Sequence, residues 1–306
     1  MKNKTMKYII VAKDEHAGTN KDDKPSPHLV TEIATELIIT RLALFDMLQL
    51  GEISISDTIV TRNERKCLYT NVFSNVISWQ EFNSMSLDSA EQCIDLVAPD
   101  KFYKLAIGSD ISACTVDALN TFTNLPYFPS YQNFDRDKKY ITNFSRSSLE
   151  DYNTSYPFVA INIRRRSAWA EQKNQPDRFW QRLNQRLYKS NINAFVFGLE
   201  TKQFTKDHIQ YVENFQDWCT LLEHKNCRHI LSTPSGAVYP AMLFGDGSPQ
   251  ITIIDLKDCI AEHTNDPSFY GDCVNFTNVQ FDIIGSQSII NKQLEDVVYE
   301  KLTKNL

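Results

Sequence analysis

Residues 158–180 of the sequence read FVAINIRRRSAWAEQKNQPDRFW, and this stretch indicates the fold. Its first six residues, FVAINI (158–163), form an apolar run that is typical of a strand buried on both faces. Pro176 then opens an amphipathic pattern, PDRFWQRLNQRLYKS (176–190), which predicts a helix with proline in its first turn. A second apolar run, INAFVFG (192–198), ends at a glycine. Strand, helix and strand in this order predict two parallel strands joined by a crossover helix.

The same alternation continues towards both ends of the chain. In the second half the patterns predict helices at 215–226 and 235–245, the latter kinked by Pro240, and strands at 228–233 and 250–255. In the first half they predict strands at 7–12, 57–61, 75–79 and 103–107, and helical stretches at 62–73 and at 28–51, which stops at Gly51. We therefore expect an α/β protein with two Rossmann-like, doubly wound parallel-sheet domains facing a cleft.

The domain boundary is expected where this alternation stops. Residues 122–156 are rich in aromatic, Asn, Ser and charged residues without a clear period, and a linker is predicted near 146–156. The predicted division is a first domain at 1–150 and a second domain at 151–285. Residues 286–306 are predicted to form a C-terminal helix that could pack back across the domains.

Composition excludes several classes of protein. The chain has 306 residues and a formal net charge of -6, which argues against a nucleic-acid binder. No apolar run is long enough to cross a membrane, and the N-terminus lacks the core of a signal peptide. Seven cysteines, an odd number without a Cys-x-x-Cys pair, indicate reduced packing residues. We expect a soluble cytoplasmic protein, and the sequence does not indicate its oligomeric state.

Basic charge is concentrated after the strand at 158–163. Residues 164–189 hold 8 of the 32 Lys and Arg residues, beginning with three consecutive arginines. Ligands of parallel α/β domains bind beyond the carboxyl ends of the strands, and guanidinium groups there can hold phosphate oxygens. The alternative is a solvated arginine turn that pairs with nearby acids such as Glu171 and Asp177.

The segment STPSG (232–236) is a second feature suited to an anion. It follows a predicted strand and opens a predicted helix, whose first N–H groups could face an anion. Ser235 could add a hydroxyl group, and Gly236 would let a ligand approach the backbone. The alternative is that Ser235 is an ordinary helix N-cap.

These patterns together resemble GT-B glycosyltransferases. The matching features, over about residues 156–256, are a strand followed by [His/Asn]-x-Arg-Arg, an Asn-x-Pro-x-x-x-Trp segment, a strand ending in Phe-Gly, and [Ser/Thr]-x-x-Ser-Gly. The segment looks like the nucleotide-sugar-binding half of the fucosyltransferase-like and polysaccharide-synthesis branches, with Asn162 where histidine is usual. The resemblance implies that Arg164 and Arg165 contact the donor diphosphate, with Arg164 also acting in catalysis, and that Ser235 and Gly236 contact the donor phosphates.

The same resemblance implies that the domain at 1–150 is the acceptor side and that the domain at 151–285 binds the nucleotide sugar. It also points to further positions. Glu200, after the Phe-Gly strand end, and the segment 211–215 lie where such folds read the nucleoside, and Asp255 is a candidate of the same kind. The alternative for Asp255 is an ordinary acid at a strand end.

The loop at 13–28, after the first strand, is expected to supply a general base for an acceptor hydroxyl. Asp14 and His16 are the chosen candidates, and Glu15 and Asp22 are further acids of the same loop. The alternative is a solvated loop without a catalytic role. Asp135-Arg-Asp137 imitates the metal motif of the GT-A fold, but we interpret it as coincidence and expect no metal and no cofactor.

The expected function is therefore a metal-independent, hexosyl- or fucosyltransferase-like enzyme. It would move a sugar from a nucleoside-diphosphate sugar to a glycan or another hydroxyl acceptor. Two alternatives remain open: a non-catalytic relative that binds nucleotides or glycans, and a nucleotide-sugar epimerase.

Overall fold

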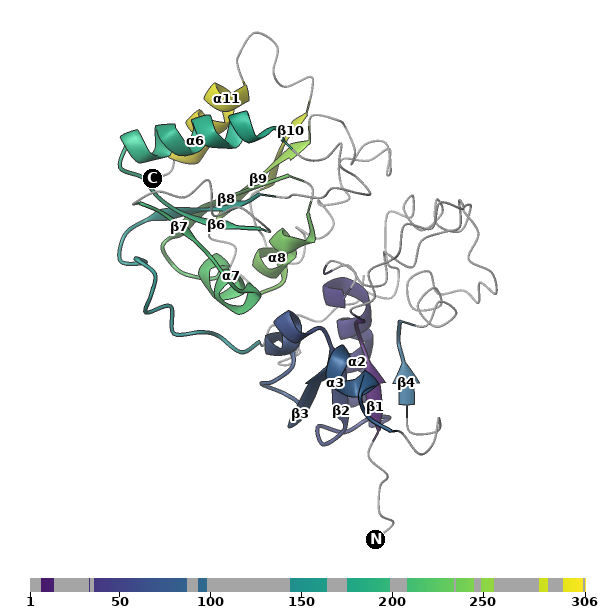
Figure 1. Ribbon diagram of the computed structural model, residues 1–306. Helices are drawn as coiled ribbons and strands as arrows, with labels where there is room; N and C mark the ends of the chain where they lie inside the picture. The colour runs from purple at the N-terminus through teal and green to yellow at the C-terminus, as the bar shows by residue number, and fades with distance from the viewer. Residues whose placement is uncertain are drawn as a thin grey trace. The chain divides into compact units, whose positions relative to one another are not determined.

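The structure is a computed structural model that describes residues 7–13, 33, 36–86, 93–97, 144–163, 175–198, 208–233, 235–244, 249–255, 281–285, 294–304 and 306. The chain divides into two compact units, Met1–Ser145 and Arg146–Leu306. Each unit contains one β-sheet, and all neighbouring strands in both sheets are parallel. The prediction of two parallel-sheet α/β units is confirmed (Figure 1).

The sheet of the first unit has four strands in the order β3-β2-β1-β4. They are β1 (Tyr8–Ile10), β2 (Thr58–Thr61), β3 (Asn75–Ser78) and β4 (Cys93–Asp95). The central strands are the most apolar, and Ile9, Ile59 and Val60 are completely buried. The sequence did not predict β4, and the predicted strand at 103–107 lies outside the described residues.

The helical segments of the first unit are shorter and less regular than the sequence predicts. The structure has a π-helix, η2 (Glu36–Thr40), followed by α2 (Arg41–Gln49), a 3₁₀-helix, η3 (Asn63–Leu68), and α3 (Trp79–Asn83). The helical stretch predicted over 28–51 is helical at 36–49 in the described part, but its residues 36–40 form a π-helix and do not have α-helical geometry. The predicted end is confirmed, since Gly51 has a φ of +72° just after α2.

Buried polar contacts fasten η2 at this position. The carboxylate of Glu36 is fully buried, and one of its oxygens accepts hydrogen bonds from Thr61 Oγ1 (2.6 Å) and the Tyr69 hydroxyl (2.8 Å). Its other oxygen pairs with the Arg65 guanidinium at 2.7 Å. Burial and the Glu36 charge raise the pKa of Tyr69, so its hydroxyl stays protonated and can donate. The carboxylate thus ties η2 to the end of β2 and to η3.

The sheet of the second unit has six strands in the order β10-β9-β8-β5-β6-β7. They are β5 (Phe158–Asn162), β6 (Asn193–Phe197), β7 (Ile209–Tyr211), β8 (Cys227–Ser232), β9 (Gln250–Asp255) and β10 (Phe281–Gly285). The predicted strands at 158–163, 192–198, 228–233 and 250–255 are confirmed. The sequence did not predict β7 or β10.

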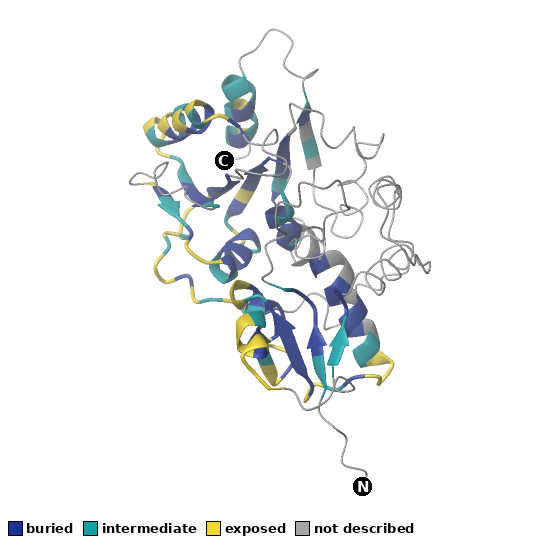
Figure 2. Ribbon diagram, turned by 45° about the vertical axis from the view of Figure 1, so that its right-hand side comes forward, coloured by how far each residue is buried: buried dark blue, intermediate teal, exposed yellow. Residues whose placement is uncertain are grey.

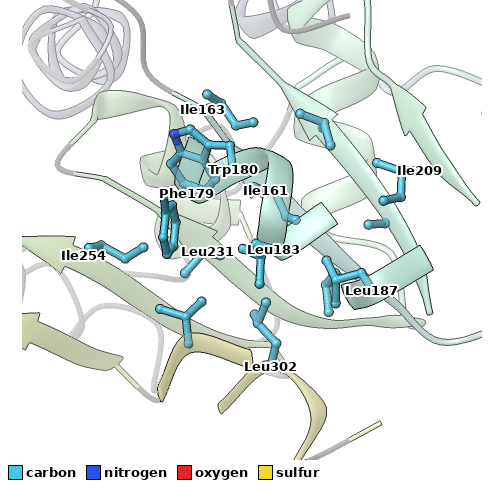
Figure 3. Close-up of a cluster of buried hydrophobic side chains, with 14 of the residues drawn as sticks. Ile161, Ile163, Phe179, Trp180, Leu183, Leu187, Ile209, Leu231, Ile254 and Leu302 are labelled. Atoms are coloured by element: carbon cyan, nitrogen blue, oxygen red, sulfur yellow. The ribbon is translucent and has the colours of Figure 1, made fainter. Parts of the chain in front are cut away.

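Helices cover both faces of this sheet. Helices α6 (Asp177–Lys189) and α11 (Leu294–Thr303) lie on one face, and α7 (Phe215–Leu222) and α8 (Tyr239–Phe244) lie on the other (Figure 1). The inner side of α6 is buried and its outer side is exposed (Figure 2). Beneath α6 and α11 lies a buried apolar cluster drawn in Figure 3, which includes Ile161, Trp180, Leu183, Leu231 and Leu302.

The predicted helix at 235–245 is divided into two segments. A 3₁₀ turn, η8 (Gly236–Val238), leads directly into α8, so the change in geometry comes before Pro240. Pro240 lies in the first turn of α8, where an α-helix does not need the missing N–H group. The helix geometry thus changes just before Pro240, and a kink at Pro240 itself stays a prediction.

The segment that leads into the second sheet is fastened to the second unit. The Arg146 guanidinium donates to Glu223, and the Tyr152 hydroxyl donates to Asp217 at 2.9 Å. The backbone carbonyl of Thr154 accepts from the Asn226 side chain at 2.8 Å. These contacts hold residues 146–154 against α7 and the loop after it.

A buried histidine lies on the α11 side of the second sheet. His229 of β8 is completely buried and shares a hydrogen bond of 2.8 Å between its Nε2 and Thr252 Oγ1 of β9. Burial, together with the positive charge of Lys301, lowers the pKa of His229 to about 4, although Asp282 opposes the shift. The folded protein therefore holds this imidazole neutral at pH values where an unfolded chain would protonate it.

This pKa shift predicts acid sensitivity of the second unit. The unfolded state binds a proton near pH 6.5 and the folded state only near pH 4, so stability falls as the pH drops between these values. The full loss is about 3 kcal/mol below pH 4, since each pKa unit corresponds to about 1.4 kcal/mol. Urea denaturation between pH 4 and pH 8 measures this loss of unfolding free energy. The variant His229→Gln should show a flatter pH profile, and an unchanged slope would contradict the assignment.

Candidate functional site

The order of strands in the second sheet marks one position for ligand binding. From β5 the chain adds β6 and β7 on one side, and then returns to add β8, β9 and β10 on the other side. Ligands of open parallel sheets bind beyond the carboxyl ends of the strands at the point where the strand order reverses. Here that point lies between β5 and β8.

Polar side chains meet at this point. Asn162, the last residue of β5, is buried, and its Nδ2 donates to Ser232 Oγ at 2.8 Å. Ser232, the last residue of β8, donates in turn to the backbone carbonyl of Thr233 at 2.5 Å. The Thr233 side chain is also buried, and its Oγ1 has no hydrogen-bond partner among the described residues. Such a chain of hydroxyl and amide groups at the end of two apolar strands can orient hydrogen bonds towards a polar ligand.

Residues 235–238 follow this polar group directly. Ser235 is the N-cap of η8, and its Oγ accepts a hydrogen bond from the Ala237 N–H at 3.3 Å. The structure therefore shows the capping role that was the alternative interpretation of this serine. Ser235 and Gly236 are both partly exposed, so both remain accessible at the edge of the sheet.

Trp218 of α7 holds the 235–238 segment in place. Its indole Nε1 donates to the backbone carbonyl of Ala237 at 2.8 Å, and its ring stacks on Phe197 at the end of β6 with centroids 5.1 Å apart. Trp218 is completely buried. One side chain thus connects the carboxyl end of β6 with the turn that follows β8.

This contact predicts that two buried tryptophans of the second unit differ in how much stability is lost when each is replaced by phenylalanine. Trp218→Phe would leave the buried carbonyl of Ala237 without its donor and should destabilise the unit by about 1–3 kcal/mol beyond the loss of packing. Trp180→Phe is the matched control, because the Trp180 indole nitrogen is buried without a partner among the described residues. Urea denaturation compares them. Equal losses of stability would show that the hydrogen bond to Ala237 contributes little.

The backbone at the end of β6 also has a special conformation. Gly198, which follows β6, has a φ of +142°, which other residues rarely adopt, and its carbonyl accepts from the Tyr211 hydroxyl at 3.0 Å. The hydroxyl thus ties the end of β7 to the turn after β6. Glu200, two residues beyond Gly198, lies outside the described residues.

Of the other candidate residues, the structure describes Asp255 but not the arginines after β5 or the candidate bases. Asp255 is the last residue of β9, at the carboxyl edge of the sheet and two strands from β5. Arg164 and Arg165 come just after Ile163, the last described residue behind β5, and they lie outside the described part of the chain, as does Arg166. Asp14 and His16 lie outside it as well, after Lys13.

Sequence reasoning did not select Ser232, Thr233 or Trp218 as site residues. Ser232 and Thr233 could have been found, because they are hydroxyl residues at the end of an apolar run in a predicted parallel sheet. No sequence signal marks Trp218, since a tryptophan on an amphipathic helix is typical of a core residue.

In the described ranges, no group of three or more His, Cys, Asp and Glu side chains could hold a metal ion. The described part of the chain also contains no helix that is long and apolar enough to span a membrane. Cys67 and Cys227 are buried and free, and burial raises the pKa of Cys67 to about 12, so this thiol is a poor nucleophile.

Comparison with known proteins identifies no family for this chain. No protein-family model and no curated protein matches it. Solved structures with a similar arrangement include E. coli heptosyltransferase WaaC with ADP (11% identity, 98% of each chain covered, TM-score 0.45). Others are E. coli ADP-heptose LPS heptosyltransferase II (12%, 98% of each chain, 0.48) and a family 9 glycosyl transferase from Veillonella parvula (11%, 98% of this chain and 90% of that chain, 0.44). At such low identities and scores, these similarities assign no function to the chain.

Proposed function

We propose that the protein is a glycosyltransferase that uses a nucleoside-diphosphate sugar as donor. The donor binds to the second unit, at the carboxyl ends of β5 and β8. The observation that carries this proposal is the hydrogen-bonded pair Asn162 and Ser232, which lies at the reversal of strand order. The sequence continues from this point into three arginines, a composition suited to a diphosphate.

The arginines have the main chemical role in this proposal. Negative charge develops on the leaving nucleoside diphosphate as the bond to the sugar breaks, and Arg164 and Arg165 stabilise that charge. The backbone N–H groups of Ser235 and Gly236 and the Ser235 hydroxyl bind the donor phosphates. Because guanidinium groups supply the positive charge, the proposed reaction requires no metal ion. Glu200 and Asp255 are proposed to contact the nucleoside.

The first unit supplies the acceptor side of the reaction. The segment after β1 contains Asp14 and His16, and one of them takes the proton of the acceptor hydroxyl as it attacks the sugar. The resemblance to the fucosyltransferase-like branch remains a prediction, and the structures compared above include heptosyltransferases. We therefore leave the transferred sugar open.

A thermal-shift screen against GDP-, UDP-, ADP-, CMP- and dTDP-sugars tests the proposal. A ligand that binds only the folded state stabilises it by mass action, by about 2.7 kcal/mol at a hundred times its Kd. For a unit of this size the expected rise in melting temperature is roughly 5–10 °C. Sugars of one nucleotide should raise the melting temperature clearly more than the others. An unchanged melting temperature with all of them would contradict the proposal.

Product analysis with the identified donor separates the alternatives. Transfer to a hydroxyl acceptor is the expected result. Conversion of the donor sugar without an acceptor would indicate an epimerase, and binding without any product would indicate a non-catalytic relative.

A further inference from the structure

The sheet of the first unit has its own reversal of strand order. The chain forms β1, then β2 and β3 on one side of it, and then returns to place β4 on the other side. The reversal therefore lies between β1 and β4. By the rule applied to the second sheet, ligands are expected beyond the carboxyl ends of these two strands.

Three side chains from the ends of three strands meet at this position. Lys13, just beyond β1, pairs its Nζ with Asp95 Oδ2, at the end of β4, at 2.7 Å. The same ammonium lies 5.2 Å from the ring centroid of Trp79, the first residue after β3. Trp79 is in turn stacked on Phe82 of α3, with ring centroids 5.6 Å apart. The indole is thus fixed by its own helix, and it holds the ammonium towards Asp95.

Both charged groups keep capacity for further hydrogen bonds. An ammonium has three N–H donors, and among the described residues Lys13 uses one of them for Asp95. A carboxylate has about four acceptor sites, and Asp95 uses one oxygen for Lys13 and the other for the Val97 N–H at 3.1 Å. The Lys13 and Asp95 side chains are 21% and 27% exposed, so solvent or a ligand can reach them.

We propose that Lys13 and Asp95, backed by Trp79, form a subsite for two adjacent hydroxyl groups of a sugar. Asp95 accepts a hydrogen bond from one hydroxyl, and Lys13 donates to the oxygen of its neighbour. A fixed donor and a fixed acceptor side by side match a vicinal diol. This inference rests on the proposed function and names a carbohydrate as the ligand of the first unit.

An ordinary surface ion pair would also bring Lys13 and Asp95 together, but three features favour a ligand. The pair lies at the reversal of strand order and not at an arbitrary surface position. An indole ring fixes the ammonium from one side. In the sequence, Lys13 is followed directly by residues 14–22, which include the candidate bases Asp14 and His16.

Saturation-transfer NMR on the whole chain tests this subsite. The probes are methyl glucoside, methyl mannoside and methyl galactoside, with tetrahydropyran as a ring that lacks hydroxyl groups. At least one glycoside should bind the wild-type protein, and tetrahydropyran should not. Lys13→Met and Asp95→Asn should each weaken binding by about tenfold or more, because each removes a hydrogen bond to a charged group. Circular dichroism checks the fold of both variants.

Lys7→Met is the matched control, because Lys7 lies next to the amino end of the same strand and donates to the Glu52 carbonyl. It should bind the glycosides as the wild type does. Absence of glycoside binding in the wild type, or equal binding in all variants, would overturn the subsite. The nucleotide screen tests the proposed donor separately from the subsite. If nucleotides bind but glycosides do not, the subsite alone is contradicted. If glycosides bind but no nucleotide does, the proposed donor is contradicted.

Discussion

Replacing Arg164 by alanine should lower the rate of glycosyl transfer by about a hundredfold or more, the loss expected when one donor to a developing negative charge is removed. Arg164 comes two residues after Asn162, the end of the central strand β5. The loss should appear in kcat as well as in kcat/KM, because the charge on the leaving diphosphate grows only as the bond breaks. Release of nucleoside diphosphate from the donor found in the screen measures the rate.

The stability of this variant separates catalysis from folding. We expect the free energy of unfolding to change by less than about 0.5 kcal/mol, because the proposed role of Arg164 is to bind the donor and not to stabilise the fold. Arg178→Ala is the matched control, since Arg178 is an exposed arginine on α6 that faces away from the buried cluster. If Arg164→Ala retained full activity, or if Arg178→Ala lost as much, the diphosphate role of Arg164 would be wrong.

Glu36→Gln should produce the largest loss of stability in the first unit. The substitution removes the negative charge that pairs with the buried Arg65 guanidinium at 2.7 Å. Breaking a buried ion pair by removing one partner costs about 3–5 kcal/mol, because the buried Arg65 guanidinium loses the carboxylate that lies 2.7 Å from it. Hydrogen exchange at residues 58–69 reports the loss, since β2 and η3 both contact Glu36.

Glu64→Gln provides the control for this loss. Glu64 lies 2.8 Å from Arg62 and 3.9 Å from Arg65, but 45% of its side chain is exposed, so these ion pairs should contribute less than about 1 kcal/mol. Exchange at residues 227–232 of the second unit should not change in either variant. Similar effects of the two substitutions would show that Glu36 stabilises the unit no more than a surface acid.

Strands with strong apolar patterns could be predicted from the sequence. FVAINI, INAFVFG and ITIID correspond to β5, β6 and β9, because a strand buried on both faces leaves a continuous apolar run. β4 and β7 have three residues each, and Asp95 and Gln210 interrupt their apolar patterns, whereas the equally short β1 lies in the apolar run YIIVA. Their positions depend on pairing with β1 and β6, and a local pattern does not contain that information.

The irregular helices escaped prediction for a different reason. The pattern over 28–51 has helical spacing, yet residues 36–40 are a π-helix. Glu36 must reach Thr61, Arg65 and Tyr69, which are 25 to 33 residues away in the sequence. Tertiary contacts of this kind override local propensity.

The candidate site was predictable in position and less so in detail. Polar residues after the apolar run at 158–163 indicated the carboxyl edge of a parallel sheet, and Asn162 lies there. The sequence could not show that β8 is the neighbour of β5, so the pairing of Asn162 with Ser232 could not be predicted. Likewise, the support that Trp218 gives to Ala237 exists only in the folded chain.

Hydrogen exchange of the whole chain with the nucleoside diphosphate of the donor tests the central claim most directly. The claim is that this nucleotide binds at the carboxyl ends of β5 and β8. At saturating nucleotide, peptides covering residues 158–166 and 227–238 should exchange more slowly, while exchange at residues 58–69 of the first unit stays the same. Unchanged exchange in both peptides of the second unit, with nucleotide bound, would contradict the claim.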